Sequence, residues 1–125
     1  MIIQTKYCVT AVIYDTENRI FLMTSSKWNG YIVPGGKKEI SETDEEALRR
    51  EIREELKIEL TNLEKICETI KEPSNEFYDP TLRFYFSNYL AKACSTIIVP
   101  NREVKSYGWF SVADAMQLPL AKGIR

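Results

Sequence analysis

The chain has 125 residues, of which 44% are apolar and 28% are charged, an ordinary composition for one globular domain with a buried core. The net charge is −1, so no overall basic field favours nucleic acid as a partner, and the absence of histidine excludes histidine-based triads and histidine metal ligands. No run approaches about 18 apolar residues, so we expect no membrane span. We also expect no signal peptide, because no long apolar stretch follows a basic N-terminal region. The length favours a single domain over residues 1–125, which we expect to be cytoplasmic.

The first third of the chain predicts β-structure. Stretches rich in β-branched and aromatic residues alternate with short polar segments, which is typical of strands joined by turns. In chain order we expect a strand over 5–14, a turn over 15–18, a strand over 19–24, a loop over 25–31 and a short strand at Ile32 and Val33 that ends in Pro34-Gly35-Gly36. The first two strands predict a hairpin.

A helix is expected next. Thr43 followed by Glu46 matches a capping box, and Ser41 is a competing cap. An apolar stripe with a spacing of four residues runs along this segment: Leu48, Ile52 and Leu56. This stripe predicts that one side of the helix packs on a sheet while the acidic side faces a cleft.

The second half predicts more strands and a final helix. In order we expect a strand over 60–70, a loop over 71–81, a buried strand over 82–91, a short strand over 107–110 and a helix from the cap Ser111 to about Leu118. Residues 92–101 show no clear pattern. Strands on both sides of a helix, with a terminal helix, indicate an α/β fold, an α/β/α sandwich around a mixed sheet.

Three carboxylates lie at i, i+3 and i+4 on the expected central helix: Glu51, Glu54 and Glu55. This spacing places them on one face, where like charges repel and a divalent cation such as Mg²⁺ or Mn²⁺ would relieve the repulsion. The alternative is a solvated face with ion pairs, which Glu45 with Arg49 and Glu46 with Arg50 would fit. Three widely spaced cysteines without a CxxC pair indicate reduced thiols and disfavour a zinc cluster.

The glycine pair in front of this helix adds a second motif. The pattern G-x5-E-x7-R-E-U-x-E-E-x-G-U, with U a bulky aliphatic residue, is matched by Gly36, Glu42, Arg50, Glu51, Ile52, Glu54, Glu55 and Ile58. The chain therefore resembles the Nudix hydrolase family, and in particular its small single-domain MutT-like members. One position departs: Lys57 stands where the family has glycine, which puts the local loop geometry in doubt.

The resemblance implies a Nudix fold and a pyrophosphohydrolase. It implies Mg²⁺-dependent cleavage of the pyrophosphate bond in a nucleoside diphosphate derivative, such as a nucleoside triphosphate or ADP-ribose, with Mn²⁺ as a substitute ion. The implied metal ligands are Glu51, Glu54 and Glu55 with the carbonyl of Gly35, and less firmly Glu39.

The resemblance also implies roles around the metal ions. Glu51 or Glu54 could orient or deprotonate the attacking water. Glu103 is a candidate for a base supplied by a distant loop, and its alternative is a surface acid before a strand. Arg50 would position a glutamate of the motif, and Glu42 would support the loop.

Substrate contacts are less defined by the sequence. Gly35 and Gly36 would let the backbone approach phosphate closely, and aromatic residues such as Trp28 and Tyr78 could stack on a base. Arg83 could hold a phosphate, although an exposed strand arginine is the plainer interpretation. Pro73 lies at a position seen in members similar to ADP-ribose pyrophosphatases, but a lone proline is more often a turn former.

Two other functions stay open at this point. One is a catalytically weak, nucleotide-binding sensor, which the full set of motif carboxylates disfavours. The other is hydrolysis of RNA ends, which the absence of a basic stripe disfavours. We expect a small-molecule nucleotide substrate and no membrane or nucleic-acid partner, and since family members often dimerise, a homodimer is compatible with the resemblance.

Overall fold

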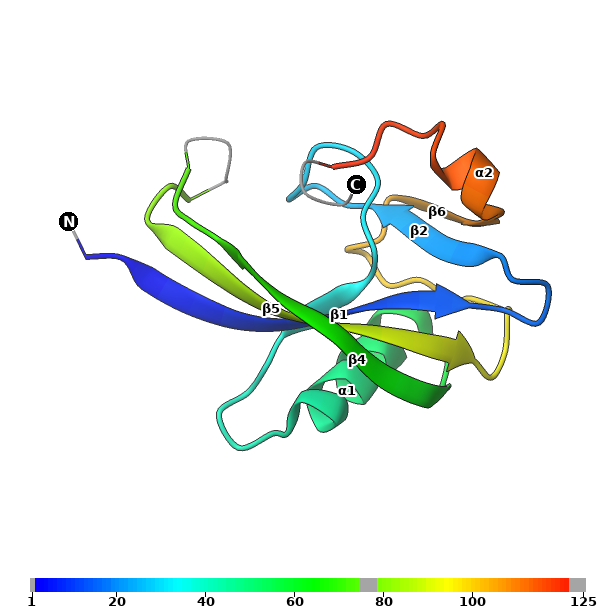
Figure 1. Cartoon of the computed structure of the whole chain (residues 1–125), viewed down its shortest axis with the longest axis horizontal. Coiled ribbons are helices and arrows are strands. Elements are labelled where there is room, and N and C mark those ends of the chain that lie inside the picture. The colour runs from blue at the N-terminus through cyan, green and yellow to red at the C-terminus, as the bar shows by residue number, and fades with distance from the viewer. Residues whose placement is uncertain (1, 75–78, 122–125) are drawn as a thin grey trace.

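The computed structural model describes residues 2–74 and 79–121 (Figure 1). The elements in chain order are β1 (Gln4–Tyr14), β2 (Ile20–Thr24), β3 (Gly35–Lys37), α1 (Asp44–Leu56), β4 (Leu60–Lys71), β5 (Leu82–Ala93), β6 (Ser106–Phe110) and α2 (Val112–Ala115). No helix within these described ranges is long and apolar enough to cross a bilayer.

The strands form one mixed sheet. Its order is β4-β5-β1-β2-β6, and β3 pairs with β1 off this path. β1 runs parallel to β5 and antiparallel to β2 and β3, while β4 and β6 pair antiparallel with β5 and β2. α1 and α2 lie on opposite sides of the sheet in Figure 1, with α2 beside β2 and β6, so the predicted α/β/α sandwich is confirmed.

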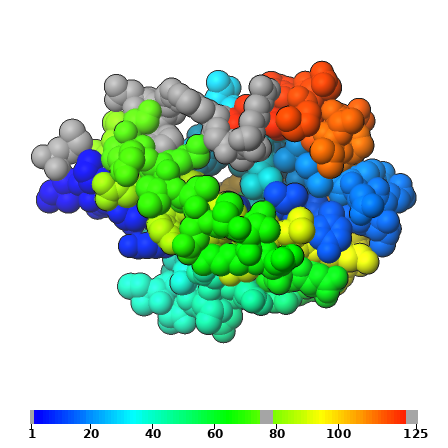
Figure 2. All heavy atoms as spheres, in the orientation of Figure 1, coloured from blue at the N-terminus to red at the C-terminus, as the bar shows by residue number. Residues whose placement is uncertain are grey.

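The core lies between α1 and the sheet. The predicted stripe of Leu48, Ile52 and Leu56 is fully buried and packs in one cluster with Val9, Ala11 and Ile13 of β1. Burying a leucine or isoleucine side chain of this kind contributes about 1.5–3 kcal/mol. In the space-filling view of Figure 2, side chains of β4 (green) cover the middle of the visible face above those of α1.

The helix begins as the sequence predicts. Thr43 is the N-cap, and its side chain accepts from the Glu46 N–H while the Glu46 side chain accepts from the Thr43 N–H. This capping box is confirmed over the competing Ser41. The helix ends at Lys57 in the left-handed conformation, at φ 60° and ψ 36°. The lysine thus adopts the backbone turn usually left to glycine, and its Nζ donates to the Glu54 carbonyl at 2.8 Å.

Two predicted elements differ in the structure. The short strand is β3, and it begins at Gly35 rather than at Ile32, which makes only an isolated bridge to Met23. Glycines are usually taken as strand ends, but here they pair with β1 because the two backbones approach closely. The final helix ends at Ala115 rather than at about Leu118, because the chain then tightens into turns in which the N–H groups of Gln117 and Leu118 donate to the carbonyls of Asp114 and Ala115.

Candidate functional site

The glycine pair sits where β1, β3 and α1 converge. A Cβ on Gly35 would overlap the carbonyl oxygen of Val9, and a Cβ on Gly36 would overlap the carboxylate of Glu51. Neither glycine has a positive φ, so both are required by space rather than by backbone conformation. The missing side chains let the Glu51 carboxylate from α1 lie against the strand backbone.

The three helix carboxylates do not share one environment. Glu55 is buried, the side chain of Glu51 is 16% exposed and that of Glu54 is 54% exposed. Glu51 and Glu55 line a pocket beside β3, while Glu54 is not among its lining residues. The prediction of a single acidic face therefore holds for Glu51 and Glu55, which both line the pocket. Glu54 lies at the outer margin of this face.

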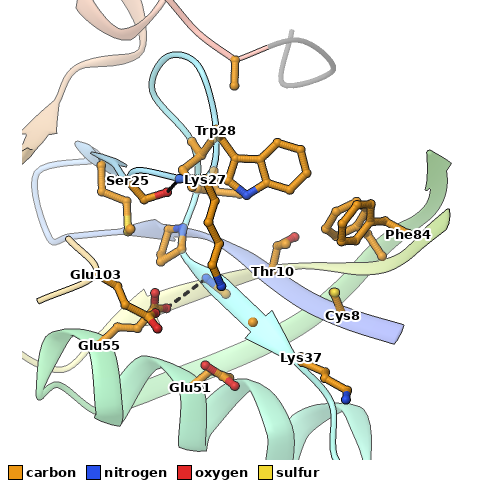
Figure 3. A pocket seen from close by; sticks show the side chains of 18 of the residues that line it. Cys8, Thr10, Ser25, Lys27, Trp28, Lys37, Glu51, Glu55, Phe84 and Glu103 are labelled. Carbon is orange, nitrogen blue, oxygen red and sulfur yellow. Dashed lines mark hydrogen bonds between the residues drawn. The ribbon is translucent and has the colours of Figure 1, made fainter. Parts of the chain in front are cut away.

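A loop brings a further carboxylate to this wall. The backbone N–H of Asn101 donates to the Glu55 carbonyl at 2.8 Å, and the Asn101 side chain accepts from the Glu103 N–H at 2.9 Å. These bonds dock the segment after β5 onto the end of α1. Figure 3 shows Glu103 next to Glu55, with Glu51 farther along the helix, so the structure brings Glu103 to the carboxylates of the motif.

Arg50 organises the outer carboxylates. Its guanidinium donates to both oxygens of Glu42, at 2.6 and 2.9 Å, and to Glu51 at 3.0 Å and Glu54 at 3.2 Å. It also donates to the Lys37 carbonyl at 3.0 Å, which ties α1 to β3. The bonds from Arg50 lower the pKa of Glu42 to about 2. This network supports the predicted positioning role of Arg50.

The buried carboxylates carry an electrostatic cost. Burial, followed by the charges of Glu51 and Glu103, raises the pKa of Glu55 to about 8. Burial also raises the pKa of Glu51, against the opposing charge of Arg50. The hydrogen bond that the Glu55 carboxylate accepts from the Gly35 N–H is long, at 3.3 Å, and too weak to offset desolvation.

This donor set fits a hard divalent cation. All its members are oxygens, which suit Mg²⁺ or Mn²⁺, and a cation would relieve the repulsion that raises the pKa of Glu55. Over residues 2–74 and 79–121, no three acidic or cysteine side chains already converge on one ion position. Glu51 and Glu54 instead both contact Arg50, so ion binding would require their carboxylates to reorient.

The pocket beside the carboxylates has a volume of about 310 Å³, in the range of small-ligand sites. Its lining includes Gly35, Gly36 and Trp28, three of the residues for which the sequence suggested substrate contacts. Trp28 packs edge-on against Phe84 at 5.5 Å between ring centroids. Figure 3 shows this aromatic side of the pocket facing the glutamates.

Two predicted residues lie outside the pocket lining. Arg83 is not among the pocket residues and pairs with Glu72 at 2.6 Å, as the plainer interpretation of an exposed arginine expects. Glu39 is exposed in the loop before α1, and its N–H donates to Glu42 at 2.9 Å. Tyr78 falls outside the described residues.

The sequence analysis missed the pocket lysines. Lys27 lies in the loop after β2, and Figure 3 shows its side chain extending toward the carboxylate wall. Lys6, Lys37 and Lys71 also line the pocket. Strand alternation could have found Lys6, because it lies two residues before Cys8 on the same face of β1.

Comparisons with known proteins agree with this geometry. A family model described as the NUDIX domain matches residues 4–125. The uncharacterised Nudix hydrolase YvcI of Bacillus subtilis (strain 168) is 26% identical over 117 residues, which cover 92% of this chain and 72% of that protein.

Solved structures are similar over nearly the whole chain. The MutT NUDIX hydrolase from Burkholderia pseudomallei has 26% identity and a TM-score of 0.79, covering 98% of this chain and 94% of that one. The NUDIX domain of Shewanella oneidensis NrtR, crystallised with ADP ribose, has 18% identity and a TM-score of 0.78 over 97% of this chain and 82% of that one, a likeness in fold. The match of the family model over almost every residue shows that this chain belongs to the Nudix family and is a Nudix hydrolase.

Proposed function

We propose that this Nudix hydrolase cleaves the pyrophosphate bond of a nucleoside diphosphate derivative in a Mg²⁺-dependent reaction, with Mn²⁺ able to substitute. The observation that carries the proposal is the placement of Glu51, Glu55 and Glu103 on one wall of a pocket whose opposite side is aromatic. Family membership supports hydrolysis of nucleotide derivatives in general.

The ion would be held by oxygen atoms of α1 and β3. Glu51 and Glu55 supply carboxylates at the pocket, Glu54 supplies a third from the margin, and the carbonyl of Gly35 is a further ligand. Bound there, the ion supplies charge neutralisation for the diphosphate and acidifies a water molecule. Glu39 would join this set only if its loop carried it toward the pocket.

Side chains of the protein orient the metal-binding carboxylates and deprotonate the attacking water. Arg50 holds Glu51 and Glu54, and the Gly35 N–H orients Glu55. Glu103, which lies beside Glu55, would accept a proton from the attacking water. The water oxygen bonds to one phosphorus, the bridging P–O bond breaks, and the products are two phosphomonoesters or, from a triphosphate, a monophosphate and pyrophosphate.

The nucleoside would lie against the aromatic side of the pocket. Trp28 and Phe84 offer ring surfaces for a base. The NrtR structure with bound ADP ribose supports a nucleotide of this class as the ligand of such a fold. Nucleoside triphosphates and ADP-ribose are the first substrates to test.

A nucleotide panel tests the proposal. The purified protein is assayed for monophosphate release with Mg²⁺, with Mn²⁺ and with EDTA, and ¹⁸O-labelled water shows which phosphorus is attacked. We expect turnover of at least one member, lost in EDTA and reduced at least a hundredfold in Glu51→Gln, with Glu64→Gln on exposed β4 as the matched control. Absence of turnover across the panel, together with tight nucleotide binding, would favour the sensor alternative instead.

A further inference from the structure

The pocket floor has an ordered pattern that the proposed chemistry does not use. Along β1, Lys6, Cys8 and Thr10 line the pocket, while Val9, which precedes Thr10, and Ala11, which follows it, pack in the core. This is the alternation of a strand with one face on the core and the other on the pocket.

Strand register aligns residues across this floor. Lys6 lies opposite Phe84 of β5, and Phe84 lies opposite Lys71 of β4. Residues opposite one another on neighbouring strands share a face, and all three line the pocket. Two lysines on different strands therefore flank one aromatic ring.

The next rows lead toward the carboxylates. Phe86 lies opposite Cys8 and stacks on Phe84 at 5.8 Å between centroids, and Thr10 lies opposite Gly35. Thr10 lies four residues after Lys6, which is about 13 Å along an extended strand. The flexible four-carbon side chain of each lysine can span part of this distance toward the glycines and the carboxylates.

The pocket is consequently divided into three zones. Carboxylates occupy one end, the rings of Phe86 and Trp28 form the middle, and Lys6 and Lys71 flank Phe84 in the last row. Hydrogen bonds from Thr81 and the positive charge of Lys6 lower the pKa of Asp79. The ammonium group of Lys6 would therefore interact with both the Asp79 carboxylate and a bound anion. Lys71 offers the second ammonium on the other side of Phe84.

We propose that Lys6 and Lys71 form an anion subsite that binds a second phosphate of the substrate, at the end away from the bond that is hydrolysed. The inference rests on the proposed function and specifies its substrate class: nucleoside diphosphate derivatives whose ribose carries an additional 2′- or 3′-phosphate. The diphosphate lies at the carboxylates, the nucleoside lies on the rings of Phe86 and Trp28, and the extra phosphate lies beside Phe84, held by the ammonium groups of Lys6 and Lys71. Hydrolysis itself proceeds as described above, and the extra phosphate is retained in one product.

Matched substrates that differ by one phosphate test the preference. NADPH and NADH differ at the ribose 2′-position, and coenzyme A and dephospho-coenzyme A differ at the 3′-position. We expect kcat/KM for the phosphorylated member of one pair to exceed that for its partner by about tenfold or more, because two charge-assisted contacts are added. In Lys6→Gln/Lys71→Gln the ratio should approach one, while Lys105→Gln, an exposed lysine outside the pocket, should keep the wild-type ratio.

A binding measurement separates this inference from the proposed function. Calorimetry in EDTA compares adenosine 3′,5′-bisphosphate and adenosine 2′,5′-bisphosphate with AMP, so neither metal nor turnover is involved. We expect one bisphosphate to bind about tenfold more tightly than AMP, with the gain lost in Lys71→Gln and in Lys6→Gln. Equal affinity for AMP and both bisphosphates, or ratios unchanged in the lysine variants, would overturn the subsite even if hydrolysis of other nucleotides is observed. Selective bisphosphate binding without any hydrolysis would uphold the subsite and refute the hydrolytic proposal.

Discussion

Substituting Glu55 by glutamine offers a direct measure of the electrostatic cost at the site. Glu55 is buried, and burial with the neighbouring charges of Glu51 and Glu103 raises its pKa from 4.5 to about 8. The folded protein therefore keeps a proton that the unfolded chain loses above pH 4.5. Since the folded state binds more protons in this interval, the free energy of unfolding falls as pH rises from about 4.5 to about 8.

The magnitude follows from the shift. At pH 7 the unfolded carboxyl group is about 2.5 pH units above its pKa, and at about 1.4 kcal/mol per unit the loss of stability is about 3 kcal/mol. Glutamine keeps the shape and an oxygen that can accept from the Gly35 N–H, but it carries no charge. Glu55→Gln should therefore be more stable than wild type by about 2–3 kcal/mol at pH 7 in EDTA, and nearly equal to it at pH 4.5.

Urea unfolding in EDTA at several pH values measures this difference, with Glu64→Gln as an exposed control that should follow the wild-type curve. Saturating Mg²⁺ should then stabilise wild type, by about 2.7 kcal/mol at one hundred times its Kd, and stabilise Glu55→Gln much less. Parallel pH curves for wild type and Glu55→Gln would refute the reasoning, because they would show that the buried carboxylate ionises without cost.

Three further changes probe neighbouring parts of the site. Glu54→Gln should lower Mg²⁺-dependent kcat/KM at least tenfold. The free energy of unfolding should change by less than about 0.5 kcal/mol, because the side chain is largely exposed. A loss in the free energy of unfolding as large as the loss in transition-state stabilisation would contradict this prediction. Lys57→Gly should stabilise the protein by about 1 kcal/mol in urea unfolding, since φ is 60° there, and Lys57→Ala should not. Arg50→Gln should raise the pKa of Glu42 from about 2 toward 4.5, which removes a stabilisation that wild type has in full above about pH 4.5 and loses as pH falls toward 2. Carboxyl NMR titration measures the pKa of Glu42, and an unchanged pKa would show that Arg50 is not the cause of its low value.

Local patterns in the sequence were sufficient to predict most of the helices and strands and to identify the family. The capping box at Thr43 and the stripe of Leu48, Ile52 and Leu56 depend on contacts within a few residues of one helix, so their spacing alone predicts them. The motif from Gly36 to Ile58 likewise lies within a short continuous segment, which runs from β3 through one loop to the end of α1. Its matches identify the family even though Lys57 replaces the usual glycine.

Only the tertiary structure decided how the site is divided. Glu51, Glu54 and Glu55 are equivalent in helical spacing, but packing against β3 buries Glu55, places Glu51 over Gly36 and leaves Glu54 exposed. In the sequence, two strands, β4 and β5, separate Glu103 from Glu55, and hydrogen bonds through Asn101 bring them together.

The arrangement of lysines and aromatic rings on the pocket floor could not be predicted from the sequence either. Lys6, Phe84 and Lys71 come from three strands, and their alignment depends on the register of a parallel and an antiparallel pairing. A shift of one residue in either pairing would move a lysine to the other face of the sheet. Register is set by the packing of the whole sheet on α1, a long-range interaction that local residue patterns do not encode.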